Sequence, residues 1–338
     1  MVPSPATQSL LIAESSGSED NDYDSLYGSG TGTDTTSLSS SITKYRYENG
    51  RRYHAYSDGK YWAPNDDKQN GQLDIFHHIY SLVLEGDLFK APIGNDPQSV
   101  LDLGTGTGIW AIDMADKFPS ARIIGNDLSP IQPEWVPPNL QFEIDDFTKE
   151  WAHQSNSFDF VHARALYGSI SDWPQFISRA YEVTKPGGWF ESVETTVEHL
   201  SDDNSIPKDS AVLEWGRNCK IAEEKIGKSF TLEYKIKPWM EEQGFINVVE
   251  KEYKVPVGPW PQDKHLKEIG KYNLLNMLEA AEGFTMAIYT RVLGWDPVEV
   301  HALLGQVRAE YLNRKVHGYY RLFVVYGQKP EDACKDAE

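Results

Sequence analysis

A glycine-rich stretch that follows an aspartate is the part of the sequence best suited to chemistry. Residues 100–103 are apolar apart from Asp102, and glycines follow at positions 104, 106 and 108. This order predicts a buried strand, a glycine loop and a helix. Such a loop lets backbone N–H groups come close to a bound nucleoside. The stretch therefore predicts a binding site for a nucleoside-containing ligand.

The spacing of the glycines separates two kinds of nucleotide site. A dinucleotide-binding loop starting at Gly104 and Gly106 needs a third glycine three residues later, and that position is Ile109. Glycines at 104, 106 and 108, with Asp102 two residues before the first, are instead similar to the loop of S-adenosylmethionine (SAM) methyltransferases. A nicotinamide-dependent oxidoreductase is therefore the less favoured interpretation.

An aspartate after the second predicted strand is suited to bind the ribose of an adenosine. The strand covers residues 121–126, and Asp127 comes 23 positions after Gly104. A carboxylate at the end of this strand accepts hydrogen bonds from ribose hydroxyls in nucleotide-binding sheets. The alternative is a turn aspartate before Ser129 and Pro130. With the glycine loop in place, we expect Asp127 to bind the ribose.

Two aspartates and a phenylalanine follow the third predicted strand, residues 140–144, where they can hold the adenine. We expect Asp146, in preference to Asp145, to accept the N6 hydrogens and Phe147 to stack on the ring. The alternative is an acidic helix N-cap. Asp102 either contacts the methionine ammonium or only braces the loop. The predicted cofactor-binding residues are Asp102, Gly104, Thr105, Gly106, Gly108, Asp127, Leu128, Asp145, Asp146, Phe147 and His162.

Histidines supply the candidate bases for methyl transfer. Transfer from a sulfonium is an in-line displacement, so the protein orients the acceptor and, where needed, removes its proton. His162 has the best location because it follows the strand over residues 158–161, and His54 and His317 are further candidates. For each histidine a structural role is the alternative. Arg164 is expected to bind a substrate carboxylate or to form a structural ion pair.

An aromatic and basic segment before the central region is a candidate lid. It covers residues 45–62, and its tyrosines include Tyr53, Tyr56 and Tyr61. Aromatic rings over the cofactor would shape the acceptor pocket and stabilise a sulfonium by cation–π contacts. The alternative is a strap packed on the surface of the domain.

The composition excludes several classes of protein. The net charge is −19 and no basic stripe is present, so a nucleic-acid substrate is not expected. Cys219 and Cys334 give neither a disulfide framework nor a thiolate metal site. His77 and His78 point about 100° apart on a predicted helix, which is a poor arrangement for a metal. Without a long apolar run or a signal peptide, we expect an intracellular protein, cytoplasmic or nuclear, with no membrane partner.

Alternating strand and helix patterns predict an α/β fold with a parallel sheet. Strands are expected at residues 98–103, 121–126, 140–144, 158–161, 189–195, 245–254 and 321–326, with a turn at 185–188. Helices are expected at residues 72–85, 108–118 and 173–183, through most of 196–240, and through much of 263–313. The helices around 200–235 and 262–313 are expected to build the acceptor pocket.

The composition also suggests the limits of the domains. Residues 1–43 contain no Lys or Arg and form an acidic tail that we expect to be disordered, either as a regulatory segment or as a solvated leader. The catalytic domain is expected over residues 44–330. Within it, residues 98–195 form the cofactor-binding core, and residues 196–313 form the substrate-side helices with the sixth strand. Residues 331–338 are expected to be a flexible C-terminus.

Several motifs together resemble the fungal LaeA-like class I SAM-dependent methyltransferases. They are the pair His77-His78 and residues 56–61, 64–66, 124–133, 135–139, 166–173, 317–319 and 326–330, and the resemblance extends over about residues 44–330. It implies a Rossmann-like seven-stranded sheet with its last strand antiparallel, SAM as the cofactor, and a role in fungal secondary metabolism or development. Members often have an acidic residue and an Arg before the helix that carries His-His, whereas Gly71 and Gln72 stand here.

Two functions follow from this resemblance. The first is transfer of a methyl group to a small-molecule or protein acceptor, since some members of the family resemble pathway enzymes. The second is a SAM-binding regulatory scaffold with little or no turnover, because other members are nuclear regulators that act with velvet-type partners. An acidic tail and the lack of an unmistakable base are compatible with the scaffold.

Overall fold

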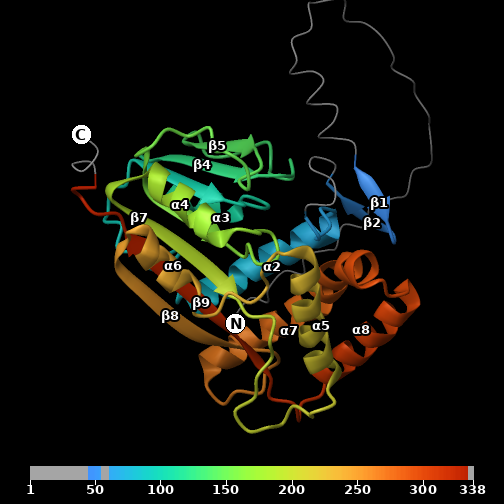
Figure 1. The fold of residues 1–338 in the computed structure, drawn as a ribbon. Helices are drawn as coiled ribbons and strands as arrows, with labels where there is room; N and C mark the ends of the chain where they lie inside the picture. The colour runs from blue at the N-terminus through green and yellow to red at the C-terminus, as the bar shows by residue number, and fades with distance from the viewer. Residues whose placement is uncertain (1–44, 55–60, 334–338) are drawn as a thin grey trace, which may run out of the picture.

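The computed structural model describes residues 45–54 and 61–333, and its centre is a seven-stranded sheet (Figure 1). The strand order is β5-β4-β3-β6-β7-β9-β8. Neighbouring strands from β5 to β7 run parallel, whereas β9 lies antiparallel between β7 and β8. This confirms the expected sheet with its last strand reversed. The strands are β3 (Ser99–Leu103), β4 (Arg122–Asp127), β5 (Leu140–Ile144), β6 (Phe158–Arg164), β7 (Thr184–Thr195), β8 (Ile246–Pro256) and β9 (Tyr319–Gln328).

The expected turn at residues 185–188 is a bulge inside β7. Pairing between β6 and β7 passes from Phe158 opposite Thr184 to Phe160 opposite Trp189, so several residues of β7 have no partner in the register. Gly187 lies in this stretch with a φ of +77°, a conformation that glycine adopts without strain. Gly187 and Gly188 therefore form a bulge within a continuous strand and do not end it.

The helices follow the strands as an α/β fold requires. Their bounds are α2 (Asp67–Val83), α3 (Ile109–Lys117), α4 (Trp173–Val183), α5 (Ala211–Ile226), α6 (Ile236–Gln243), α7 (Lys264–Ala287), a π-helical turn η1 (Ile288–Leu293) and α8 (Pro297–Tyr311). α2 begins earlier than residue 72 because the side chain of Asp66 accepts a hydrogen bond from the backbone N–H of Gln69 and caps the helix.

The expectation of helix through most of residues 196–240 is wrong for residues 196–210. This stretch is a loop in which Leu200 forms a β-bridge to Tyr319. Asp203 accepts hydrogen bonds from the hydroxyl of Ser201 at 2.6 Å and from the backbone N–H of Ser205 at 3.0 Å. Such short-range side-chain bonds compete with helix formation. α5 starts only after Ser210, which caps it.

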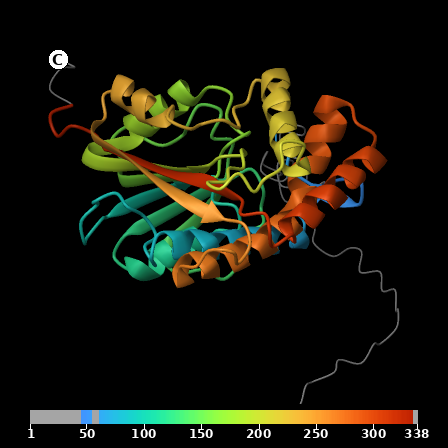
Figure 2. The ribbon, with the colours of Figure 1, turned by 90° about the horizontal axis from the view of Figure 1, so that it is seen from below.

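The sheet is covered on both faces. α4 and α6 pack on one face, and α2, α3 and α7 pack on the other (Figure 2). Each face has its own apolar core, and the core under α2, α3 and α7 continues into α5 and α8. A hairpin of β1 (Arg46–Glu48) and β2 (Arg51–Tyr53) lies near α8 (Figure 1). No helix in the described ranges is long and apolar enough to cross a membrane.

Candidate functional site

The glycine loop joins β3 to α3, and at two of its glycines neighbouring side chains leave no space for a Cβ. Gly104 has a φ of +70°, and a Cβ there would lie 2.5 Å from Cδ2 of Leu166. Gly108 has a φ of +81°, and its Cβ would collide with the ring of Phe142. The backbone N–H of Thr105 bonds the carbonyl of Asn126 at 2.9 Å and fixes the loop against β4. The close packing therefore requires glycine at both positions, and the backbone of the loop carries no side chain there.

Asp127 ends β4 and organises two neighbouring segments. Its carboxylate accepts the backbone N–H groups of Gly106 and Ser129, each at 2.9 Å. Burial raises the pKa of Asp127 to about 6, although both hydrogen bonds favour its charged form. Asp127 therefore does have the structural role in the turn before Ser129 that was the alternative to ribose binding. The carboxylate also lines a cavity, where its remaining lone pairs can accept hydroxyl groups.

This cavity lies at the carboxyl ends of the parallel strands and encloses about 970 Å³. Its wall includes eight of the predicted residues: Tyr61, Gly104, Gly106, Asp127, Leu128, Asp146, Phe147 and Arg164. Backbone N–H groups, a carboxylate at the end of β4 and a carboxylate beside a phenyl ring are the groups that an adenosine requires. The residues present therefore fit the cofactor that the glycine spacing suggests.

Asp146 and Asp145 differ in their position. Asp146 is buried on the cavity wall, and its Oδ1 accepts both the backbone N–H and the hydroxyl of Thr148. Asp145 does not line the cavity and accepts the backbone N–H of Asp146 at 2.8 Å. A turn follows the pair, so the expected alternative of a helix N-cap is not what the structure contains.

Asp102 is held by two partners behind the glycine loop. Its Oδ1 lies 2.7 Å from Nδ1 of His162, and its Oδ2 accepts the hydroxyl of Thr105 at 2.6 Å. His162 is 1% exposed and stacks on Trp110, with ring centroids 3.7 Å apart. Burial lowers the pKa of His162, so at neutral pH its Nδ1–H donates to the carboxylate. The structure thus places His162 behind Asp102 and not on the wall of the cavity.

A second, smaller hollow of about 450 Å³ adjoins the cavity on the other side of the glycine loop. Asp102, Thr105 and Arg164 line it, and Arg164 lines both spaces. The guanidinium of Arg164 donates to Nδ1 of His77 at 3.1 Å and lies 4.6 Å from the ring centroid of Tyr80. Burial lowers the pKa of Arg164.

Sequence reasoning missed the contribution of α2 to this hollow. Nε2 of His77 lies 2.9 Å from Oδ2 of Asp113, so His77 connects Asp113 on α3 with Arg164 on β6. His78, its neighbour, faces Tyr272 instead, with ring centroids 4.4 Å apart. The pair His77-His78 was a visible signal, but only helix packing could be inferred from it.

The N-terminal segment contributes one predicted residue to the cavity. Tyr61 lines it, and the ring of His54 is buried 5.9 Å from that of Tyr61. Tyr53 lies under the guanidinium of Arg291, 4.5 Å from its ring centroid, and lines neither space. Tyr56 lies outside the described residues. Of the described part of this segment, the hairpin forms a strap, and only Tyr61 reaches the candidate site.

Ion pairs hold this strap in place. Arg51 pairs with Asp66 at 2.6 Å, and Glu48 pairs with Arg291 at 2.6 Å.

His317, the third candidate base, is bonded to Asp203 at 2.6 Å and stacks on Trp260. It lines neither the cavity nor the hollow.

Comparison with known proteins agrees with this geometry. A protein-family profile described as a methyltransferase domain matches residues 76–250. Methyltransferase pytC of Aspergillus terreus is 42% identical over 301 residues, which cover 89% of this chain and 93% of the relative. The secondary metabolism regulator LAE1 of Cochliobolus heterostrophus is 37% identical over 290 residues, covering 84% and 94%.

The solved structures that match this backbone include phosphoethanolamine N-methyltransferase 2 of Haemonchus contortus in complex with SAM. It is 17% identical, with a TM-score of 0.46, and the match covers 88% of this chain and 73% of that one. The sequence relatives and the methyltransferase profile are sufficient to assign the family. The chain belongs to the LaeA-like family of class I SAM-dependent methyltransferases, which is linked to fungal secondary metabolism.

Proposed function

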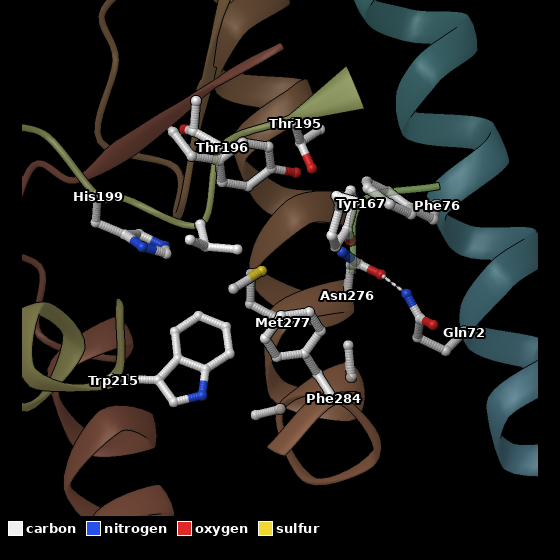
Figure 3. Close-up of a pocket in the computed structure, with 14 residues that line it drawn as sticks. Gln72, Phe76, Tyr167, Thr195, Thr196, His199, Trp215, Asn276, Met277 and Phe284 are labelled. Atoms are coloured by element: carbon white, nitrogen blue, oxygen red, sulfur yellow. Dashed lines mark hydrogen bonds between the residues drawn. The ribbon is translucent and has the colours of Figure 1, made fainter. Parts of the chain in front are cut away.

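We propose that the chain transfers the methyl group of SAM to a small, largely apolar acceptor that carries at least one ring. The observation that carries this proposal is an aromatic cavity between α2, α5 and α7 (Figure 3). Its lining is mostly aromatic and apolar with a few polar groups, as in many small-molecule sites. Bound SAM supplies a methyl group that is already activated on a sulfonium, so the chain has mainly to bind and orient the acceptor.

The wall of this acceptor cavity is aromatic and fixed. Trp215 of α5 and Phe284 of α7 point into it, with ring centroids 5.2 Å apart (Figure 3). The indole N–H of Trp215 donates to the hydroxyl of Thr285 at 2.8 Å. The hydroxyl of Tyr320, another lining residue, donates to Asn273 at 3.0 Å. Rings held in this way bind a flat apolar molecule at little cost in side-chain entropy.

A few polar groups give the acceptor cavity an orientation. Gln72 donates from its side chain to Oδ1 of Asn276 at 2.6 Å across the wall (Figure 3). His199 lines the opposite side and is bonded to the hydroxyl of Tyr311 at 3.0 Å. Burial lowers the pKa of His199 to about 4, so the imidazole is neutral at neutral pH. Neutral hydrogen-bonding groups among rings match an uncharged acceptor better than a charged peptide.

The acceptor cavity lies next to the cofactor site. Phe76 of α2 lines both this cavity and the hollow beside the glycine loop. Tyr167 lines the acceptor cavity, while its neighbour Leu166 lines the cofactor cavity. These shared walls support the proposal that an acceptor bound here lies close to the cofactor.

The proposal assigns the predicted residues as follows. Asp127 holds the ribose hydroxyls, Asp146 and Phe147 hold the adenine, and the backbone of the glycine loop lies along the ligand. His162 acts through Asp102 as a positioning residue. His54 is buried and lines neither the cofactor cavity nor the acceptor cavity. It remains a candidate base only as a residue that acts by way of Tyr61, since the two rings lie 5.9 Å apart.

The same proposal covers the wider organisation of the chain. The catalytic unit is residues 44–330, and a regulatory protein partner in the cytoplasm or nucleus would act on this unit from outside. The name of the LAE1 relative, a regulator, supports such a partner. Because this relative is named a regulator, a SAM-binding regulatory scaffold is the second candidate function.

The acceptor cavity can be tested by filling it without touching the cofactor site. Ala280 lines the cavity, so Ala280→Phe places a ring inside it. Ala302→Phe is the matched control, since Ala302 is exposed on α8. We expect 1-naphthol, measured by calorimetry in the presence of S-adenosylhomocysteine (SAH), to bind the wild type and Ala302→Phe and to bind Ala280→Phe at least about tenfold more weakly. SAH binding should be unchanged in both variants.

Three results would contradict this proposal. Equal binding of 1-naphthol to Ala280→Phe and to the wild type would show that the acceptor cavity is not the binding site. Failure of 1-naphthol to bind a wild type that binds SAH would favour a protein acceptor. Binding of SAH without label transfer from methyl-labelled SAM to any small molecule of a phenol and indole panel would favour the scaffold.

A further inference from the structure

A chain of side-chain amides runs from α2 to the wall of the acceptor cavity. Nε2 of Gln69 donates to Oε1 of Gln72 at 2.7 Å, and Nε2 of Gln72 donates to Oδ1 of Asn276 at 2.6 Å. All three side chains are buried. Gln72 and Asn276 line the cavity, whereas Gln69 does not reach it. This amide chain therefore connects the interior of the protein with the place where the acceptor is proposed to bind.

A cation sets the direction of the amide chain at its inner end. A Cβ at Gly283 would collide with Oε1 of Gln69 and would lie 3.3 Å from Nη1 of Arg51, so the amide oxygen and the guanidinium meet at this glycine. A guanidinium has donors only, and its positive charge favours the oxygen end of an amide. Gln69 therefore turns its oxygen toward Arg51 and its nitrogen toward Gln72. Each later amide of the chain repeats this orientation.

The orientation leaves the nitrogen of Asn276 for the acceptor cavity. Gln72 occupies the oxygen of this amide, and Figure 3 shows the nitrogen turned away from Gln72. Within the described part of the chain, Nδ2 of Asn276 has no hydrogen-bond partner. The residue is 2% exposed, so this donor has little access to bulk water. A buried N–H without a partner is costly, and a ligand that supplies an acceptor atom removes this cost.

The rest of the cavity wall is neutral and largely satisfied. Trp215, Tyr320 and His199 each form a hydrogen bond to another protein side chain. Of the described residues that line the cavity, none is Asp, Glu, Lys or Arg. A carboxylate buried here would have no cation to balance it, which is unfavourable. The donor of Asn276 therefore matches a neutral oxygen.

We propose that the acceptor carries a carbonyl oxygen beside its ring, and that Nδ2 of Asn276 donates a hydrogen bond to this oxygen. Asn276 is then a specificity-determining residue, and Gln72 and Gln69 are positioning residues that keep its donor toward the cavity. A carbonyl oxygen accepts near the plane of its substituents, so the ring can lie against the aromatic wall while the oxygen reaches the amide. This inference rests on the acceptor cavity of the proposed function.

The test compares two ring compounds that differ only in a carbonyl group. 7-Hydroxy-1-tetralone carries it, and 5,6,7,8-tetrahydro-2-naphthol has a methylene in its place. Calorimetry on the wild type in the presence of SAH should give the ketone an affinity about 3- to 10-fold higher, since the methylene compound leaves the donor of Asn276 unpaired. In Asn276→Leu the ratio of the two affinities should fall to about one or below, because the carbonyl leaves water without gaining a new partner.

Further variants separate Asn276 from its neighbour on the wall. Gln72→Leu/Asn276→Leu removes both amides and should give the same ratio as Asn276→Leu. Gln72→Leu alone frees the amide of Asn276 to turn, so its ratio should lie between those of the wild type and Asn276→Leu. Asn95→Leu, which changes an exposed asparagine before β3, should leave the ratio unchanged. SAH should bind all variants equally, because Asn276 and Gln72 line neither the cofactor cavity nor the hollow.

Infrared spectroscopy gives a readout that a purely structural role of Asn276 would not change. The ketone is labelled with carbon-13 at its carbonyl, so that its stretching band is separated from the bands of the protein. A hydrogen bond weakens the C=O bond, so the band of the bound ketone should lie at lower frequency in the wild type than in Asn276→Leu. Asn95→Leu should give the band of the wild type.

Several outcomes would overturn the proposal. Equal affinities of the two compounds for the wild type would exclude the carbonyl contact, and this result does not depend on the folding of any variant. A ratio that is kept in Asn276→Leu but lost in the double variant would assign the donor to Gln72. A ratio kept in both would place the carbonyl elsewhere.

The same measurements distinguish failure of this inference from failure of the proposed function. If 1-naphthol binds the wild type but binds Ala280→Phe weakly, the outcomes above reject only the carbonyl contact. If neither 1-naphthol nor the two test compounds bind a wild type that binds SAH, the acceptor cavity itself is rejected, and the carbonyl contact is rejected with it.

Discussion

Asp102 accepts a hydrogen bond from Nδ1 of His162 across the β3–β6 pair, at 2.7 Å. The imidazole is clamped from the side by Trp110, whose ring is within 6° of parallel to it. A buried histidine that donates to a carboxylate and cannot leave its stack orients that carboxylate. It is poorly placed to collect a proton from an acceptor.

This relationship predicts the behaviour of His162→Phe. The phenyl ring keeps the stack on Trp110 but removes the N–H donor, so Asp102 keeps only Thr105. Losing a partner of a buried charge should lower the free energy of unfolding by about 1–3 kcal/mol and weaken SAH binding. Urea unfolding and calorimetry measure both, with His78→Phe as the exposed control. Full stability and full SAH binding with complete loss of turnover would instead identify His162 as a catalytic base.

Asp127 predicts a pH dependence of cofactor binding. Its pKa is raised to about 6 by burial, and ribose hydroxyls donate more strongly to the ionised carboxylate. SAH affinity should therefore fall as the pH is lowered from 7.5 to 5. Asp127→Asn should bind SAH about tenfold or more weakly at pH 7.5 and lose this dependence. Asp145→Asn, off the cavity wall, is the control, and a flat pH profile in the wild type would argue against the ribose contact.

Glu191 predicts a pH dependence of stability. Its Oε2 accepts the backbone N–H groups of Lys90 and Ala91, and burial raises its pKa to about 7. The folded protein therefore holds this proton more tightly than the unfolded chain. As the pH rises from about 4.5 to 7, this group should lower the free energy of unfolding by about 3 kcal/mol in total.

The variant Glu191→Gln isolates this contribution. The side-chain oxygen of the glutamine can accept both N–H groups without ionising. The free energy of unfolding of Glu191→Gln, relative to that of the wild type, should therefore increase as the pH rises from about 4.5 to 7. Urea unfolding at pH 4.5 and 8 measures the difference. Glu150→Gln changes an exposed loop residue and should have the same free energy of unfolding as the wild type at both pH values. Parallel pH profiles for Glu191→Gln and the wild type would refute the assignment.

Gly108 predicts a stability effect in the cofactor loop. Gly108→Ala imposes a side chain at a φ of +81° and drives its Cβ into the ring of Phe142. Together these should lower the free energy of unfolding by about 2–5 kcal/mol. Gly305→Ala, in an exposed turn of α8 with open space around it, should instead raise it by up to about 1 kcal/mol. Thermal unfolding compares the two variants, and combining Gly108→Ala with Phe142→Leu should recover the part due to the collision.

The order of the elements and the cofactor loop were accessible to sequence reasoning because their signals are local. β3 is an apolar run, and Val100, Leu101 and Leu103 are fully buried in it. The mistaken helix over residues 196–210 has a local cause as well. Asp203 and its serine neighbours form short-range bonds that helical periodicity does not reveal.

The charge pattern of the hollow was not accessible in this way. Arg164, His77 and Asp113 come from β6, α2 and α3, and no spacing in the sequence connects them. For Asp102 the sequence left two roles open, and packing decided that both of its oxygens have protein partners.

The sequence by itself determined where the backbone opens for a ligand, since glycine conformation and apolar periodicity act over a few residues. Only the tertiary structure decided which charges meet there. α2 must pack beside α3 before His77 can link Asp113 to Arg164, and α5 must pack beside α7 before the acceptor cavity exists. Contacts between distant segments depend on how whole elements pack, and that information is not contained in any single stretch of the chain.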